Sequence, residues 1–283
     1  MKIIECPRDA MQGIEEFIPT SKKVEYINSL LKIGFDTIDV GSFVSAKAIP
    51  QMADTSQVIP QLDIVSSKSK LLVIVANERG AEEASNFEQI TYLGFPFSIS
   101  ETFQKKNINS TIKESLIKLE KVQNKAINNN KKLVTYFSMA FGNPYGDEWS
   151  AYIVAHWAEK LLNEFGINIL SLSDTVGTSN RESISWLFNK LIKDFPEVEF
   201  GAHLHTTKDQ WEEKIDSAIN SYCNRFDTAI LGFGGCPMAT DKLTGNMPTE
   251  NLITYLERRN IAHNLDKQAF NYAIQNARDI FKI

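Results

Sequence analysis

The sequence predicts an α/β fold, a (β/α)₈ TIM barrel with extra C-terminal helices. Two observations predict it: short β-branched apolar runs alternate with segments of helical spacing, and there are eight such runs. Eight strand–helix units favour closure into a barrel over an open sheet. The expected strands are residues 2–6, 36–40, 71–75, 89–93, 132–140, 167–173, 198–205 and 226–231.

The segments between these runs place apolar side chains on one face of a helix. We expect Thr20 or Ser21 to cap the first helix, Ser150 to precede another, and Gly166 to end it. Clear helical spacing covers residues 20–34, 110–129, 150–166 and 180–195.

The chain shows no linker rich in Gly, Ser or Pro, so residues 1–283 are expected to form a single barrel domain. Residues from about 249 onward read as helical and exceed what eight simple units need. We expect this extension to pack beside the barrel or to reach a partner chain, which leaves a homodimer open.

Composition excludes several classes of protein. Thirty Lys and Arg against 35 Asp and Glu give a net charge of −5, which argues against a broad nucleic-acid surface. Three cysteines without a CxxC pair argue against a disulfide framework or a zinc ribbon. Without a signal peptide or a run of about 18 apolar residues, we expect a soluble, cytoplasmic protein with no membrane partner. The phosphate-binding motifs GxGxxG and GxxxxGK[ST] are absent.

Polar residues gather where the expected strands end, which is the functional rim of such a barrel. His203 and His205 are the strongest signal, because residues i and i+2 of a strand point the same way and can ligate one ion. The alternative is a pair of barrel-lining or surface histidines. The other rim residues are Arg8 and Asp9 after the first strand, Asp39 in the second, and Asp174 after the sixth.

Each of these residues also has a structural interpretation. Arg8 and Asp9 fit an ion pair or helix cap as well as a cation beside a metal ligand, and Asp174 fits an N-cap. Cys236 lies in a loop with four glycines, where a thiol near neutral pH can donate a proton. Lys47 is an anion contact or a solvated loop lysine.

Five stretches resemble the 3-hydroxy-3-methylglutaryl-CoA lyase family, in the superfamily of metal-dependent TIM-barrel lyases and Claisen-condensing enzymes. They are PRDAMQ (7–12), DVGSFVSAKAIPQMAD (39–54), SLSDTVGT (171–178), HLH (203–205) and GFGGCPMATDKLTGNMPTENL (232–252). The last is the most specific, because its cysteine-bearing glycine loop distinguishes the lyases from the synthases.

The resemblance implies a divalent cation, Mg²⁺ or Mn²⁺, and an acyl-CoA substrate. The reaction it implies splits 3-hydroxy-3-methylglutaryl-CoA into acetyl-CoA and acetoacetate, as in leucine degradation. The metal ligands it implies are Asp9, His203, His205 and Asn246. In the roles it implies, Arg8 neutralises the enolate, Asp174 assists proton transfer, Cys236 is an acid, and Glu250 matches an acidic residue after the loop. For the base and the acid, His203, Asp174 and Cys236 are all candidates.

The chain departs from the family pattern at three positions. Ala10 replaces Gly, Asp39 replaces Glu, and Thr206 replaces an Asp after the histidine pair. The shorter Asp39 is expected to reach Arg8 through a re-spaced bond or through water, and Thr206 is expected to weaken support of the metal histidines.

Two alternatives to the lyase stay open. One is a Claisen-type synthase or a hydroxy-acid aldolase, which would use the same metal and arginine. The other is a barrel that binds metal or CoA without turnover, for which Asp39 and Thr206 are the only support.

Overall fold

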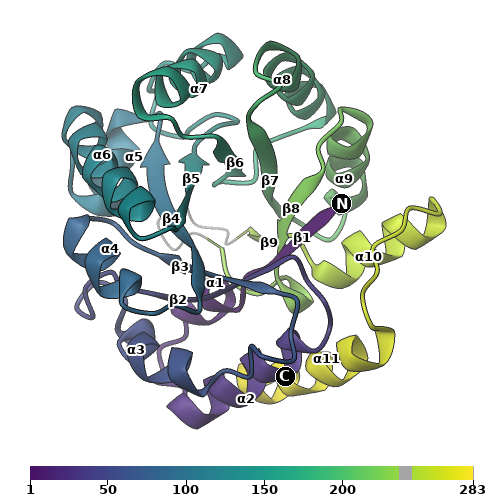
Figure 1. The fold of residues 1–283 in the computed structure, drawn as a ribbon. Coiled ribbons are helices and arrows are strands. Elements are labelled where there is room, and N and C mark those ends of the chain that lie inside the picture. Colours follow the sequence, from purple (N-terminus) through teal and green to yellow (C-terminus); the bar gives the residue numbers. More distant parts are fainter. Residues whose placement is uncertain (236–243, 283) are drawn as a thin grey trace.

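In the computed structural model, which describes residues 1–235 and 244–282, eight parallel strands close into a barrel (Figure 1). Each strand pairs with its sequence neighbour, and β8 pairs with β1 to close the ring. The predicted fold class is confirmed, and every expected run overlaps a barrel strand. The strands are β1 (Lys2–Glu5), β2 (Thr37–Ser42), β3 (Lys70–Ile74), β4 (Ile90–Ser98), β5 (Lys132–Ser138), β6 (Ile169–Asp174), β7 (Glu199–Thr206) and β8 (Arg225–Thr228).

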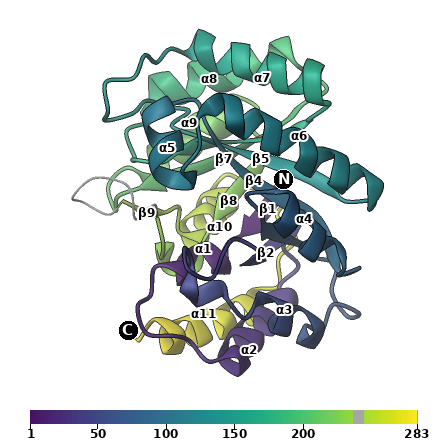
Figure 2. The same cartoon turned by 90° about the vertical axis from the view of Figure 1, so that its left-hand side faces the viewer.

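Helices surround the strands on all sides in the axial view and lie along the barrel in the side view (Figures 1 and 2). Short 3₁₀ turns occupy Pro50–Met52, Ile59–Gln61 and Ile230–Gly232. The helices are α1 (Pro7–Gln12), α2 (Thr20–Leu31), α3 (Thr55–Val58), α4 (Glu78–Ser85), α5 (Glu101–Ile108), α6 (Ile112–Asn128), α7 (Ala151–Phe165), α8 (Arg181–Asp194), α9 (Trp211–Asn220), α10 (Thr249–Arg258) and α11 (Lys267–Phe281).

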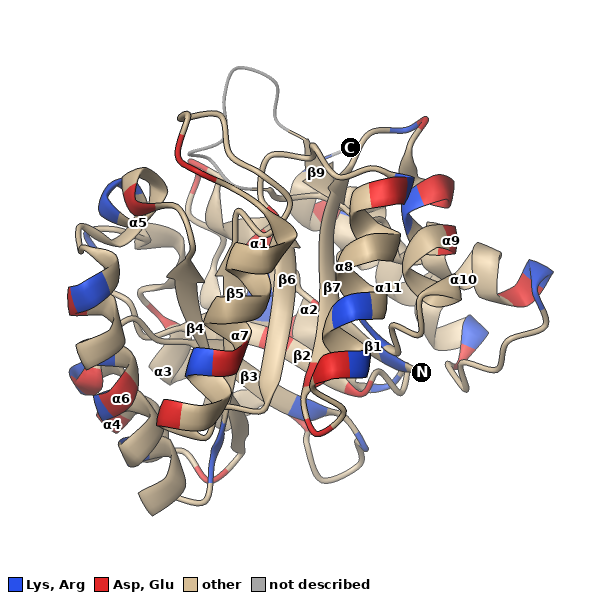
Figure 3. Ribbon diagram, turned by 90° about the horizontal axis from the view of Figure 1, so that it is seen from above, with Lys and Arg blue, Asp and Glu red and all other residues tan. Residues whose placement is uncertain are grey.

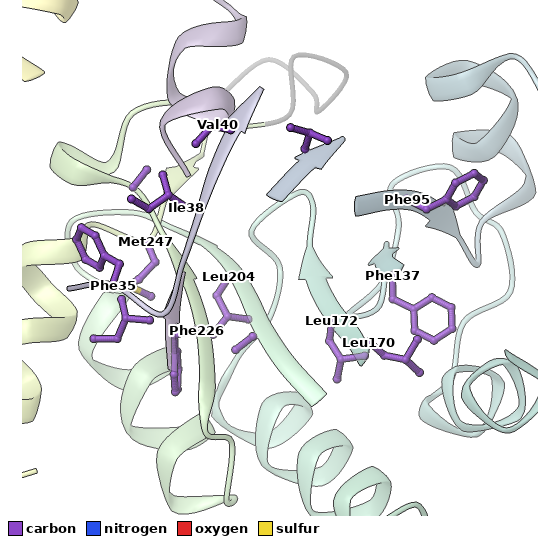
Figure 4. Close-up of a cluster of buried hydrophobic side chains, with 14 of the residues drawn as sticks. Phe35, Ile38, Val40, Phe95, Phe137, Leu170, Leu172, Leu204, Phe226 and Met247 are labelled. Carbon is purple, nitrogen blue, oxygen red and sulfur yellow. The ribbon is translucent and has the colours of Figure 1, made fainter. Parts of the chain in front are cut away.

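The core has two parts because side chains alternate between the two faces of each strand. Ile38, Val40, Leu170 and Leu172 belong to the large cluster that packs the strands against the helices (Figure 4). A smaller cluster comes from the other strand positions and fills the barrel interior: Leu72, Ile74, Tyr92, Val134, Tyr136 and Ile169. Buried on both faces, the strands read as continuous apolar runs.

Two of the predicted helix boundaries are confirmed and one is wrong. Ser150 caps α7 by accepting a bond from the Ile153 amide, and Gly166 ends α7 in the left-handed conformation with φ 65°. Thr20 is the first residue of α2 and makes no cap; its hydroxyl donates instead to Asp54 at 2.8 Å.

The extension beyond residue 249 forms α10 and α11, and α11 packs beside the barrel against α2 (Figures 1 and 2). The ring of Phe281, in α11, meets Tyr26, in α2, edge-on at 6.2 Å. Positive and negative residues are interspersed on the outer helices (Figure 3). Among the described residues, no helix is long and apolar enough to cross a membrane.

Candidate metal centre at the barrel mouth

Arg8 and Asp9 lie in the first turn of α1, which begins directly after β1. Pro7 begins this helix, where its fixed φ and missing N–H are tolerated. Gln12 follows one turn later; its side chain accepts a bond from Arg8 at 2.9 Å and donates to Asp9 at 2.8 Å. The PRDAMQ motif is therefore a short helix that holds both charged groups, buried, at the mouth of the barrel.

Asp9, His203 and His205 come together at this mouth. Their ligand atoms all lie within 4.8 Å of one another, although Asp9 and the histidines are almost 200 residues apart in the chain. The two imidazoles occupy alternate positions of β7 and point to the same side, with ring centroids 5.3 Å apart. The histidine pair thus lines the site and does not lie on the surface.

Asn246 reaches the same place through a short strand, β9 (Gly245–Asn246), that pairs antiparallel with β7. In this pairing Asn246 lies opposite His205. The amide nitrogen of Asn246 donates to Asp9 at 2.6 Å and to the carbonyl of Phe233 at 2.8 Å. The structure therefore brings all four predicted ligand residues together, with the nitrogen of the Asn246 amide facing Asp9.

The donor set fits a divalent cation. His205 Nδ1 lies 3.1 Å from the carbonyl of Thr175, whereas its buried Nε2 has no hydrogen-bond partner. Burial, and then His203, lower the pKa of His205 to about 4, so its ring is neutral at pH 7. Burial acts to raise the pKa of Asp9, but Arg8, His203 and Asn246 together bring it to about 2. A carboxylate and a neutral imidazole with a free lone pair are ready ligands for Mg²⁺ or Mn²⁺.

Arg8 is fixed by two carboxylates. Its Nη1 lies 2.9 Å from Asp9, while Nε and Nη2 both contact Asp39 Oδ2, at 2.9 and 2.5 Å. Of the two expected arrangements for the shorter Asp39, the structure shows a direct bond to Arg8 and not one through water. Burial raises the pKa of Asp39 to about 6 against the opposing effect of Arg8.

A cavity of about 320 Å³ opens above these groups. Its lining is mostly apolar with a small number of polar groups, as is usual for small-molecule sites. Arg8, Asp9, Gln12, His203 and His205 line it together with Tyr136, Ser138, Ser173, Thr175, Phe103, Asn107, Val44 and Ile49.

Asp174 does not line this cavity. Since Ser173 and Thr175 point into the cavity, Asp174 between them faces the outer side of β6. Its carboxylate pairs with Lys214 at 2.7 Å and accepts bonds from Ser179, all within the buried part of the protein. We therefore do not keep Asp174 as a group that exchanges protons with a substrate.

The ring of His205 makes its hydrogen bond with a residue other than Thr206. The Thr206 hydroxyl donates to the carbonyl of Thr207, and the ring of His205 is held by the Thr175 carbonyl. Lys214 supports the backbone here by donating to the carbonyl of His205 at 2.8 Å. Other residues thus orient the imidazole at this position.

Three further predicted residues lie in different settings. Glu250 lies in the first turn of α10 and accepts a bond from the Leu231 amide at 3.1 Å, outside the set that lines the cavity. Lys47 is exposed in the segment after β2, next to the cavity-lining Ala48. Cys236 lies outside the described residues.

Sequence reasoning missed Asp227 and Tyr136. Asp227, in β8, lies 3.3 Å from Nδ1 of His203, and the ring of Tyr136 meets His203 edge-on at 5.7 Å. An acidic residue inside an otherwise apolar strand was the available signal for Asp227. Tyr136 carried none, because an aromatic residue is ordinary in a strand.

Comparison with known proteins agrees with this geometry. The HMGL-like family model matches residues 2–276. The chain belongs to the HMGL-like family. It is 34% identical over 259 residues to rat 3-hydroxy-3-methylglutaryl-CoA lyase, cytoplasmic, covering 90% of this chain and 74% of that protein.

Solved structures of this family superpose closely on the chain. The HMG-CoA lyase from Brucella melitensis matches with a TM-score of 0.91 and 29% identity, covering 100% of this chain and 99% of that one. The HMG-CoA lyase from Acinetobacter baumannii, in complex with coenzyme A and 3-methylmalate, matches with a TM-score of 0.91 and 27% identity, covering 99% and 91%.

Proposed function

We propose that this protein is a divalent-metal-dependent lyase that cleaves 3-hydroxy-3-methylglutaryl-CoA into acetyl-CoA and acetoacetate. The observation that supports this most is the convergence of Asp9, His203 and His205 within 4.8 Å, beside a buried Arg8, in a member of the HMGL-like family. The proposed substrate follows from the relatives and structural neighbours, which are named HMG-CoA lyases.

Asp9, His203 and His205 would hold the cation, with Asn246 as the proposed fourth ligand. Ligation by Asn246 through oxygen requires its amide to turn over, because the nitrogen faces Asp9. Carboxylate, imidazole and amide donors without a thiolate suit Mg²⁺ or Mn²⁺. When bound, such an ion supplies Lewis-acid chemistry that makes the substrate hydroxyl more acidic.

Arg8 is the group that meets the negative charge released by C–C cleavage. Breaking the bond moves an electron pair toward the thioester carbonyl, and a fixed cation in a site shielded from water stabilises the resulting enolate. One preorganised donor of this kind typically contributes about 3–4 kcal/mol. Asp39 holds the guanidinium through two nitrogens, so Arg8 need not reorganise as charge develops.

Proton transfer is proposed for groups inside the cavity and on the glycine loop. With Asp174 turned to the outer side of β6, and His203 lining the cavity as a proposed metal ligand, Cys236 is the candidate that remains for the acid. A positioned proton donor or acceptor typically contributes about 10²–10⁴-fold to the rate.

Lys47 is our proposed contact for an anionic part of the acyl-CoA. It is exposed next to Ala48 and Ile49 at the cavity rim, where the nucleotide end of a long substrate would leave the barrel. A homodimer also remains a prediction.

The decisive experiment incubates the purified protein with 3-hydroxy-3-methylglutaryl-CoA and Mg²⁺ and measures acetoacetate. We expect acetoacetate and acetyl-CoA in equal amounts, and loss of both after chelation. Asp54→Asn, which changes a buried carboxylate paired with Lys23 away from the site, serves as the matched active control. Release of CoA from acetyl-CoA and a 2-oxo acid, without lyase activity, would identify a synthase instead.

A further inference from the structure

We propose that Asp227 is a positioning residue that fixes the imidazole of His203 as a metal ligand. This inference rests on the metal site of the proposed function. Asp227 Oδ2 lies 3.3 Å from His203 Nδ1, and the two side chains come from neighbouring strands, β8 and β7. Asp227 is only 3% exposed, so this carboxylate is held inside the barrel.

The carboxylate is itself anchored from a third strand. The hydroxyl of Ser171, in β6, donates to Asp227 Oδ2 at 2.6 Å. The oxygen that faces His203 is therefore the one that Ser171 holds, which prevents the carboxylate from rotating away. Hydrogen bonds to an ionised acceptor are among the stronger ones in proteins.

The position of Asp227 decides which nitrogen of His203 is free. A neutral imidazole carries one N–H, and a carboxylate next to Nδ1 favours the proton there. Nε2 then keeps its lone pair and becomes the ligand atom. His205 reaches the same state differently, because its Nδ1 faces the neutral carbonyl of Thr175 at 3.1 Å.

A purely structural role as counter-ion to Arg225 is less well supported by the distances. Arg225 Nε lies 4.0 Å from Asp227 Oδ1, whereas its Nη1 pairs with Glu199 at 3.0 Å. The closer contacts of Asp227 are those with Ser171 and His203. Carboxylates that contact a metal-ligating imidazole in this way typically change metal affinity by about 10–100-fold.

The test is the affinity of full-length Asp227→Asn for Mn²⁺, measured by calorimetry and by the electron paramagnetic resonance of free Mn²⁺. We expect a dissociation constant about 10–100-fold above that of the unaltered protein. Asp54→Asn, which also neutralises a buried carboxylate, should bind Mn²⁺ normally. Equal affinity in Asp227→Asn and the unaltered protein would overturn the inference, as would unaltered protein that binds no Mn²⁺.

Ser171→Ala provides a second route in case Asp227→Asn does not fold. It removes only the hydroxyl that anchors the carboxylate, and we expect weaker Mn²⁺ binding in the same direction; unchanged affinity would count against the inference. Because the titration contains no acyl-CoA, it tests the role of Asp227 in metal binding independently of the proposed reaction. Normal Mn²⁺ binding that is weakened in the variants, without acetoacetate formation, would refute only the proposed function.

Discussion

Lys214 and Asp174 form an ion pair of 2.7 Å in which both side chains are almost fully buried. The same ammonium group donates to the carbonyl oxygens of His205 and Gly177. The pair thus connects α9 to the ends of β6 and β7, directly behind one of the metal-site histidines.

Removing the cation of this pair should destabilise the fold strongly. Lys214→Met leaves Asp174 buried without its partner, a change that typically costs about 3–5 kcal/mol. Urea unfolding followed by circular dichroism measures this cost. The double variant Lys214→Met/Asp174→Leu should lose much less than the sum of the single changes; strict additivity would show that the two groups do not interact.

The ionisation of Glu5 should lower the free energy of unfolding as pH rises. Its carboxyl accepts bonds from Thr249 at 2.6 Å and from the Ile230 amide at 2.8 Å, and burial raises its pKa from 4.5 to about 8. The folded state therefore holds a proton that the unfolded state releases, so this contribution is complete below about pH 4.5 and is lost as pH rises through 8.

Glu5→Gln removes that titration while keeping the shape of the side chain. In the unaltered protein, the free energy of unfolding should be lower at pH 8 than at pH 5. In Glu5→Gln this decrease should be smaller, by as much as a few kcal/mol. Parallel pH dependences in the two proteins would contradict the prediction.

Two substitutions should separate metal binding from chemistry. His205→Ala removes an imidazole whose Nε2 is free, and it should lower bound metal measured by atomic emission. Arg8→Met should leave most of the metal in place and reduce turnover by about two orders of magnitude or more, since it removes a charge-stabilising donor. Normal turnover in Arg8→Met would refute its role toward the enolate.

Gly234→Ala should damage the site through the backbone. Gly234 has φ +90°, and an added Cβ would lie 2.6 Å from the Asn246 amide nitrogen and 2.7 Å from the Asp9 carbonyl oxygen. We expect weaker metal binding and a destabilisation of about 1–3 kcal/mol. Gly13→Ala is the matched control because its Cβ would meet no atom within 4 Å. If both alanine variants bound metal normally, the close approach of Gly234 to Asn246 and Asp9 would not matter for metal binding.

Much of the fold and of the ligand set could be predicted because both follow from simple periodicities. Apolar runs bounded by turns located every barrel strand, and the two-residue repeat placed His203 and His205 on one side. The same repeat puts Asp174 opposite Ser173, but which of the two faces the cavity depends on how β6 sits in the barrel.

Other features depend on contacts between distant segments, which carry no local signal. Asp174 and Lys214 are 40 residues apart, and Asp227 is 56 residues from Ser171. The sequence around each of these residues contains no signal that identifies its partner. The orientation of the Asn246 amide likewise depends on two acceptors from other segments, Asp9 and Phe233.

The antiparallel pairing of β9 with β7 has a consequence for biosynthesis. Asn246 follows Asp9 by 237 residues and joins it only when β9 aligns with β7. A nascent chain stalled before this point would carry three of the four ligand residues without the fourth. Assembly of the complete site would therefore wait until β9 has been synthesised and has paired with β7.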